Sequence, residues 1–236
     1  MELIKPYTEI LTSVDGNEVL KTIEMVARTC YKSEHLITDD SAKVMVSSLL
    51  KRGHEAMIEF YDITVKFVCD RGVSHEIVRH RVASYAQEST RYCNYSKDKY
   101  AGQLTFIIPC WLTKLEEGPY AERDGFWIHP ITMETRKGYT GDASDKFVRS
   151  LCESEELYLD LIKLGWSPQE ARAILPNSLK TEINVKMNLR EWRHFFNLRC
   201  APAAHPQMRE LTIPLLEKMH NLVPIIFDDL YEKYCK

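Results

Sequence analysis

Hydrophobic positions along the chain repeat with two different periods, which predicts a mixture of helices and strands. Where apolar residues recur every three or four positions, as at Val19, Leu20 and Ile23, the pattern predicts a helix with one face in the core. The same spacing predicts helices over about 17–29, 41–50, 72–85, 142–164, 167–176, 188–199 and 205–220.

Alternation of polar and apolar residues predicts strands between these helices. Ile63, Val65 and Phe67 alternate with polar neighbours over 62–68, as in a strand with one buried face. A similar alternation predicts a strand over 180–187. Two shorter stretches, 104–109 and 1–12, suit a short apolar strand and an edge strand with a turn.

Capping residues mark several helix boundaries. Ser167 followed three residues later by Glu170 has the form of a capping box. Asn188 can cap the next helix, with Glu191 at the matching position. In the last predicted helix we expect a kink at Pro214.

The segment 112–143 changes character, since prolines, glycines and mixed charges interrupt it. We expect a surface excursion there. No internal repeat or linker divides the rest of the chain. We therefore expect a single domain over 1–236, of α+β class, with a central sheet flanked by helices. Because no Gly-x-Gly-x-x-Gly motif occurs, we expect no Rossmann motif.

Composition narrows the class of protein. The 236 residues are 44% hydrophobic and 28% charged, with a net charge of −3, so no overall positive charge draws the chain to nucleic acid or anionic membrane. The seven cysteines are scattered and form no Cys-x-x-Cys, which favours a reducing compartment. No signal peptide and no long apolar run are evident. We expect a cytoplasmic protein.

Charged and polar residues are concentrated in the segment 76–92, with three arginines, one histidine, two acids and two serines. On a helix, Arg79 and Arg81 would point about 200° apart with His80 between them. Three side chains that diverge in this way cannot all bind one small anion. It can line a cleft where a large ligand, or two ligands and a second subunit, meet. The alternative is a solvated basic face.

A metal site in this segment is an alternative that the spacing excludes. His75 and His80 resemble the His-Glu-x-x-His signature, but they are five positions apart. Five positions correspond to about 140° around a helix, so the two imidazoles would not share a face. We expect no metal.

A second polar group lies in the predicted helix over 188–199. Arg190, His194 and Asn197 are spaced at i, i+4 and i+7, so they form one stripe. A solvated face is the simpler interpretation. The preceding strand and cap favour a ligand site instead, because α/β proteins commonly bind ligands where strands end.

Together these motifs resemble the flavin-dependent thymidylate synthases. That family's signature is Arg-His-Arg, seven residues, then Ser, and it stands here as 79–81 followed by Ser89, with Arg91 two positions on. Further similar blocks are His54-Glu55, 171–176 and 188–199. The resemblance covers roughly 45–95 and 165–210 well.

The resemblance implies a reaction, cofactors and an assembly. Family members methylate deoxyuridine monophosphate (dUMP) to thymidine monophosphate, with methylenetetrahydrofolate as the one-carbon donor. Reduced FAD supplies the hydride and NADPH reduces the flavin again. The family forms homotetramers whose active sites draw on several subunits. No nucleic acid or membrane partner is implied.

The resemblance also implies which residues bind the ligands. Arg199 would be catalytic, since a fixed positive charge beside the pyrimidine stabilises negative charge developing on the ring. Arginines suit the nucleotide phosphate because they donate charge-assisted, bidentate hydrogen bonds. The dUMP-binding residues implied are Glu76, Arg79, Gln87, Glu88, Ser89, Thr90, Arg91, Arg172 and Arg199. The FAD-binding residues implied are His54, Arg79, His80, Arg81, Gln87, Asn188, Arg190 and His194.

Three positions depart from the family pattern. Glu76 stands where many members carry glutamine, Gln87 where many carry glutamate, and His194 where asparagine is common. The first two look like an exchange of carboxylate and amide. Two other classes stay open: a nucleic-acid-binding module that uses the arginines on phosphates, and a flavoprotein of this fold with another substrate.

Overall fold

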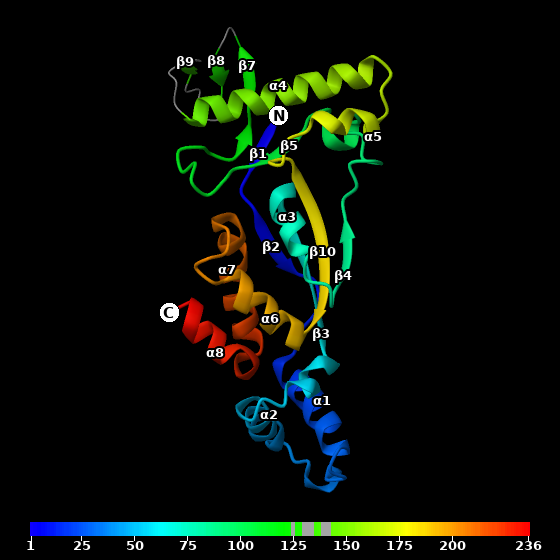
Figure 1. The fold of residues 1–236 in the computed structure, drawn as a ribbon, viewed down its shortest axis with the longest axis vertical. Helices are drawn as coiled ribbons and strands as arrows, with labels where there is room; N and C mark the ends of the chain where they lie inside the picture. The colour runs from blue at the N-terminus through cyan, green and yellow to red at the C-terminus, as the bar shows by residue number, and fades with distance from the viewer. Residues whose placement is uncertain (124–125, 129–134, 138–142) are drawn as a thin grey trace. The chain divides into compact units, whose positions relative to one another are not determined.

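The computed structural model describes residues 1–123, 126–128, 135–137 and 143–236, and its strands form three sheets (Figure 1). The strand orders are β5-β1-β6, β2-β3-β10-β4 and β7-β8-β9. None of the helices in these residues is long and apolar enough to span a bilayer. The expected α+β class, with sheets flanked by helices, is confirmed.

The chain folds into two compact units that are interleaved in sequence. The first unit comprises Met1–Tyr7, Val68–Ile77 and Gln87–Ile183, and the second comprises Thr8–Phe67, Val78–Ala86 and Asn184–Lys236. Strands β3 (Asp62–Asp70) and β10 (Lys180–Asn188) each contribute residues to both units. The expectation of a single domain over 1–236 stays a prediction.

The first unit has its core between a small sheet and a long helix. Strand β1 (Glu2–Ile4) pairs in parallel with β5 (Thr105–Ile107) and antiparallel with β6 (Gly118–Pro119). Helix α4 (Ala143–Lys163) leads into α5 (Pro168–Ala171), as Figure 1 shows. The shared core includes Leu3, Phe106, Leu151, Tyr158 and Leu179. The unit's other elements are α3 (Arg71–Ile77), η3 (Asp98–Tyr100), β7 (Ala121–Arg123), β8 (Phe126–Ile128), β9 (Thr135–Lys137) and η4 (Arg172–Ile174).

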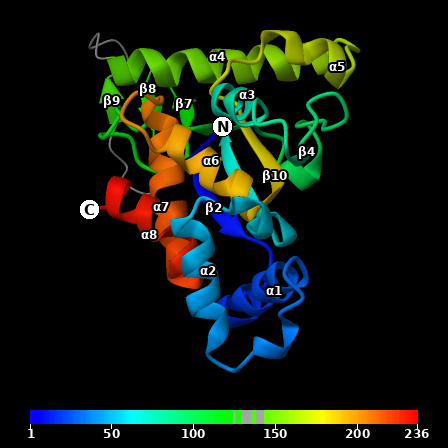
Figure 2. The ribbon, with the colours of Figure 1, turned by 60° about the horizontal axis from the view of Figure 1, so that its bottom comes forward.

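The second unit is built on the aromatic face of α6 (Leu189–Arg199). Trp192, Phe195 and Phe196 are fully buried and contact one another, with ring centroids 5.4 to 5.8 Å apart. Figures 1 and 2 both show α7 (Pro206–Leu222) and α8 (Pro224–Tyr234) beside α6. The other elements are β2 (Tyr7–Ile10), α1 (Gly16–Thr29), η1 (Glu34–Leu36), α2 (Ser41–Lys51), η2 (Glu55–Phe60) and β4 (Ser84–Gln87).

Local sequence signals predicted many of these elements correctly. Strand β10 buries Thr181, Ile183, Val185 and Met187, as the alternation predicts. The side chain of Asn188 accepts a hydrogen bond from the backbone N–H of Glu191 at 2.8 Å and so caps α6. The capping box that begins α5 is present as well.

The helix predicted over 72–85 is wrong. Helix α3 ends at Ile77, and Ser84–Gln87 forms strand β4. Val82, which extended the apparent apolar stripe, is 64% exposed. Valine is β-branched and fits a strand or loop as well as a helix, so four spaced valines and isoleucines were weak evidence for a long helix. The diverging residues Arg79, His80 and Arg81 therefore lie in an irregular segment between α3 and β4.

Other predicted boundaries also need correction. Strand β1 lies in the middle of its sheet, whereas β2 is the edge strand. A final helix, α8, begins at Pro224 and was missed. Leu115 and Tyr120 are buried in the core of the first unit, so the start of the 112–143 segment is no surface excursion. Parts of that segment (124–125, 129–134 and 138–142) lie outside the described residues.

Candidate functional site

In the first unit, two segments distant in sequence meet around a pair of arginines. Arg172 donates from Nη1 to the hydroxyl of Thr90 at 3.3 Å, and Arg91 donates from Nε to Oε1 of Gln169 at 3.1 Å. The backbone N–H of Arg91 points at the hydroxyl of Ser89, 3.3 Å away. The structure thus gathers four predicted nucleotide-site residues in one place.

The capping box at the start of α5 explains how Arg172 comes to this place. Both the backbone N–H and the hydroxyl of Ser167 donate to the carboxylate of Glu170, at 2.8 and 2.5 Å. These hydrogen bonds fix the first turn of α5, which carries Gln169 and leads to Arg172. Because α5 passes directly into the single turn η4, Arg172 stands at a fixed junction between the two.

Gln87 and Glu88 are engaged by the surrounding protein. The amide of Gln87 donates to the hydroxyls of Ser74 at 3.0 Å and Thr181 at 3.2 Å. The carboxylate of Glu88 accepts from the hydroxyl of Tyr95 at 3.1 Å and from Lys180 at 3.2 Å. Both residues therefore brace the strand end that leads to Ser89.

Burial and the charge of Glu88 shift the pKa values of two neighbouring side chains. Burial works against the ammonium of Lys180, but hydrogen bonds and charges from Glu182 and Glu88 raise its pKa. Burial raises the pKa of Tyr95, and the Glu88 carboxylate raises it further. Glu76, also predicted at the nucleotide, lies half-buried in the last turn of α3.

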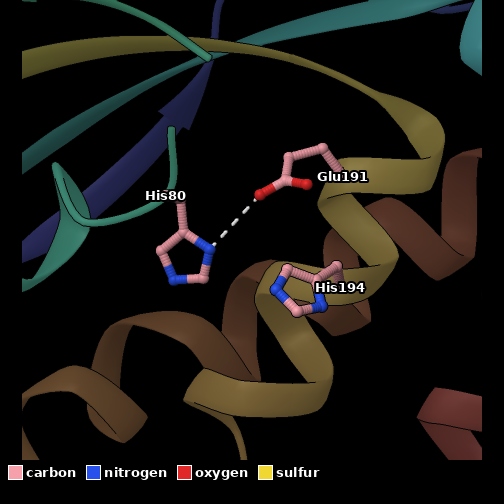
Figure 3. A group of neighbouring side chains, drawn as sticks. All are labelled: His80, Glu191 and His194. Carbon is pink, nitrogen blue, oxygen red and sulfur yellow. Dashed lines mark ion pairs between the residues drawn. The ribbon is translucent and has the colours of Figure 1, made fainter. Parts of the chain in front are cut away.

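In the second unit, His80 connects Arg199 to Glu191. Arg199 donates from Nε to Nε2 of His80 at 2.9 Å, and Nδ1 of His80 lies 3.4 Å from a carboxylate oxygen of Glu191. Figure 3 shows Glu191 and His194 projecting from α6, with the carboxylate of Glu191 turned toward the imidazole of His80. The ring of His80 is buried and packs edge-on against Phe195, with centroids 4.8 Å apart.

This environment keeps His80 neutral. Burial lowers the pKa of His80 to about 4, and the charges of Arg199 and His194 act in the same direction. Burial raises the pKa of Glu191, against the opposing effect of His194. Around neutral pH, His80 therefore holds one ring proton and one free lone pair.

His80, Glu191 and His194 also place one ligand atom each within 4.8 Å of one another, so a metal needs consideration (Figure 3). A histidine that ligates a metal normally donates its second ring N–H to an acceptor. The second nitrogen of His80 instead faces the donor Nε of Arg199. The donor set therefore does not suit a metal ion. The earlier argument against a metal, which placed His75 and His80 on one helix, was wrong in its premise.

A pocket of about 820 Å³ opens along the polar stripe of α6. Arg190, His194 and Asn197 are all exposed, as the helical spacing predicts. The residues that line the pocket are Glu55, Glu59, Val82, Asn188, Arg190, Glu191, Arg193, His194, Asn197, Asp229, Leu230 and Lys233. Three predicted FAD residues, Asn188, Arg190 and His194, thus share one pocket.

Ion pairs organise the walls of this pocket. Arg190 lies 2.6 Å from Glu59, and Arg193 makes two hydrogen bonds to Asp229, at 2.7 and 2.8 Å. Glu55 lies 3.4 Å from Arg193. Burial works against the Asp229 carboxylate, but hydrogen bonds and charge from Arg193 hold its pKa below its usual range.

The remaining predicted residues of the second unit lie at the surface. His54, Arg79 and Arg81 are exposed, whereas His80 between the two arginines is buried. Sequence reasoning missed Glu191 as a site residue and used it only as a helix-cap partner. Its position three residues before His194 on one helix was a usable signal, because residues at i and i+3 are neighbours on the surface.

Comparison with known proteins identifies a family whose members have similar sequences. The family model described as "Thymidylate synthase complementing protein" matches residues 11–225. The flavin-dependent thymidylate synthase of Pyrococcus abyssi is 31% identical over 217 residues, covering 88% of this chain and 78% of the relative. That of Pyrococcus horikoshii is 33% identical over 194 residues, covering 80% and 69%.

Solved structures share the fold at low sequence identity. The UMP/dUMP methylase PolB from Streptomyces cacaoi, bound with 5-Br dUMP, superposes with a TM-score of 0.71 at 19% identity and covers 99% of this chain and 98% of PolB. Its complex with 5-Br UMP gives 0.69 at 18% identity, with 99% and 97% covered. At this identity the likeness concerns the fold alone. From the match over 11–225 and the Pyrococcus relatives, we conclude that the chain belongs to the family of flavin-dependent thymidylate synthases.

Proposed function

We propose that this protein reductively methylates dUMP to thymidine monophosphate. Methylenetetrahydrofolate donates the one-carbon unit, FAD carries the hydride and NADPH reduces the flavin. Membership of the family supports this reaction. The observation that carries it is the contact of Arg172 with Thr90, because it brings a second arginine to the segment that holds Ser89 and Arg91.

The nucleotide phosphate binds to the cluster of the first unit. Arg91 and Arg172 supply guanidinium donors, which form strong hydrogen bonds to phosphate oxygens. Ser89 and Thr90 add hydroxyl donors beside them. Hydrogen bonds of this kind depend on orientation, and the contacts of Arg91 with Gln169 and of Arg172 with Thr90 provide it.

Two further proposed nucleotide residues of the first unit support this cluster. Gln87 and Glu88 support the segment through Ser74, Thr181, Lys180 and Tyr95. Glu76, Arg79 and Arg199 belong to the proposed dUMP set as well.

Arg199 is the proposed catalytic residue. A nucleophile that adds to the uracil ring leaves negative charge on it, and a preoriented guanidinium stabilises that charge without reorganising in the transition state. The hydrogen bond from Nε of Arg199 to buried His80 fixes one edge of the guanidinium.

FAD suits the residues of the second unit. The exposed Arg79 and Arg81 can bind its pyrophosphate, and Asn188, Arg190 and His194 line a pocket that also offers apolar walls at Val82 and Leu230. The pocket carboxylates can accept hydrogen bonds from flavin or ribose donors. His54, His80 and Gln87 belong to the same proposed set. When bound, FAD supplies the hydride chemistry, which no amino-acid side chain provides.

Two broader features belong to this proposal. The active enzyme is a homotetramer with shared active sites, which suits the diverging side chains of Arg79, His80 and Arg81. It works in the reducing cytoplasm, which suits seven scattered cysteines without a Cys-x-x-Cys. No nucleic acid or membrane takes part.

Release of tritium from carbon 5 of labelled dUMP tests the function directly. We expect release only when methylenetetrahydrofolate, FAD and NADPH are all present, and a yellow protein after purification. A colourless protein that releases no tritium but binds DNA with steep salt dependence would support the nucleic-acid alternative. A yellow protein inactive on dUMP would instead indicate a flavoprotein with another substrate.

A further inference from the structure

We propose that Glu191 is a positioning residue that orients Arg199 through His80. The inference deepens the proposed function, because it rests on Arg199 acting at the pyrimidine. Glu191 is not among the dUMP- and FAD-binding residues named above, but it lines the proposed FAD pocket, so its variants are assayed at saturating FAD. The three side chains come from the segment before β4 and from the two ends of α6.

The direction of the hydrogen bonds fixes the proton on His80. Nε of arginine carries a hydrogen and can only donate, so Nε2 of His80 must accept at the 2.9 Å contact. A neutral imidazole has one N–H, which must then be on Nδ1. Nδ1 lies 3.4 Å from Oε1 of Glu191, and we infer that this carboxylate accepts a weak hydrogen bond from it. The carboxylate thus selects the tautomer that Arg199 requires.

The surroundings hold this chain of contacts rigidly. The hydroxyl of Tyr85 donates to the backbone carbonyl of His80, and Phe195 packs against its ring. The backbone of Glu191 is fixed by the cap that Asn188 provides. The charged or titratable groups that face His80 are Arg199, Glu191 and His194.

Removal of the acceptor has a defined consequence. Without the carboxylate of Glu191, only the donor of Arg199 still favours a proton on Nδ1, and the tautomer with the proton on Nε2 becomes more accessible. Two N–H donors, of His80 and Arg199, would then face each other, and the guanidinium must turn away. A displacement of about 1 Å at a catalytic group can lower turnover on the order of 100-fold.

The tautomer can be measured without any turnover. Solid-state NMR of protein with isotope-labelled histidine distinguishes Nδ1–H from Nε2–H, and a His80→Asn variant assigns the His80 signals. We expect Nδ1–H in the wild-type protein and in Glu191→Gln, whose amide oxygen can still accept. We expect a shift toward Nε2–H in Glu191→Ala.

Kinetics then separate positioning from a general structural role. Glu191→Ala should lower kcat on the order of 10- to 100-fold, with the KM for dUMP changed less than about threefold, because the lost interaction acts in the transition state. Glu191→Gln should recover most of the activity. Glu217→Ala, which removes an exposed carboxylate from α7, is the matched control and should behave as wild type.

Two results would overturn the proposal. One is an Nε2–H tautomer of His80 in the wild-type protein, which remains decisive even if Glu191→Ala does not fold. The other is a folded Glu191→Ala variant with unchanged tautomer and kcat. If the wild-type protein does not methylate dUMP at all, the proposed function fails, while the tautomer measurement still decides the role of Glu191.

Discussion

Arg172 donates a hydrogen bond from Nη1 to the hydroxyl of Thr90, although the two residues are 82 positions apart. A neighbouring contact, from Arg91 to Gln169, joins the same two segments. The partners of both arginines in these contacts are neutral, so the contacts leave two positive charges that a nearby anion can compensate. This arrangement favours a phosphate as the ligand of the first unit.

Replacement of Arg172 by alanine should therefore weaken dUMP binding through the phosphate. A charge-assisted hydrogen bond contributes about 1.5–3 kcal/mol, which corresponds to about a 10- to 150-fold rise in the dissociation constant. Arg172→Lys should recover only part of the affinity, because an ammonium cannot bind bidentately. Isothermal titration with dUMP measures both changes.

Deoxyuridine, which lacks the phosphate, is the internal control. Its weaker affinity should not change in Arg172→Ala, and a parallel loss for both ligands would place Arg172 away from the phosphate. Arg149→Ala, which removes an arginine from the exposed face of α4, should leave dUMP affinity within about twofold.

The sequence predicted those parts of the site that depend on local signals. The alternation of β10 and the cap at Asn188 correctly placed Arg190 and His194 on the exposed side of α6. By contrast, the contact between His80 and Arg199 spans 119 positions, and the pair of Arg193 with Asp229 involves a helix that the sequence analysis missed. Neither has a periodicity or a motif that sequence reasoning can detect.

Protonation of His80 should destabilise the folded protein in acid. Its pKa is about 6.5 when unfolded and about 4 when folded, because of burial and the charges of Arg199 and His194. Between these values the unfolded state binds the extra proton, so stability falls as pH falls. The contribution of neutral His80 to the free energy of unfolding is complete above about pH 6.5 and is lost as the pH falls toward about 4. Thermal unfolding at a series of pH values measures it.

A variant without the titrating ring provides the reference for this prediction. The stability difference between wild type and His80→Asn should shrink as the pH is lowered from about 7.5 to about 4.5. The matched substitution His35→Asn removes an exposed histidine from η1 and serves as the comparison for loss of a histidine outside this buried site. A constant difference for His80→Asn would mean that its folded pKa is not lowered.

Cysteine reactivity tests the packing of both units. Burial raises the pKa of the Cys200 thiol to about 12, and burial likewise raises the pKa of Cys69, aided by Asp70. The thiolate is the reactive form, and for Cys200 its fraction at pH 8 is on the order of one in ten thousand. Iodoacetamide should therefore modify the exposed Cys30 first, as mass spectrometry can show. If iodoacetamide modified Cys30, Cys69 and Cys200 at equal rates in the native protein, this packing would be contradicted.

Arg193 should stabilise the pocket wall of the second unit. Its side chain is only 14% exposed, and it bonds to the backbone carbonyl of Ile226 as well as to Asp229. Arg193→Met keeps the aliphatic stem but removes the cation beside Asp229, and among the described residues it leaves Glu55 with only Arg190, 3.8 Å away. We expect a loss of about 1–3 kcal/mol in the free energy of unfolding. Urea denaturation measures this loss.

The same substitution should also weaken FAD binding, because Glu55 and Asp229 line the proposed cofactor pocket and would repel each other once Arg193 is gone. Arg193→Lys should restore part of the stability but less of the FAD affinity, since lysine keeps the charge and loses the two parallel hydrogen bonds. Lys21→Met, which breaks an exposed ion pair on α1, serves as the control and should change neither property. If Arg193→Met lost stability but bound FAD as tightly as wild type, the pocket along α6 would not be the flavin site.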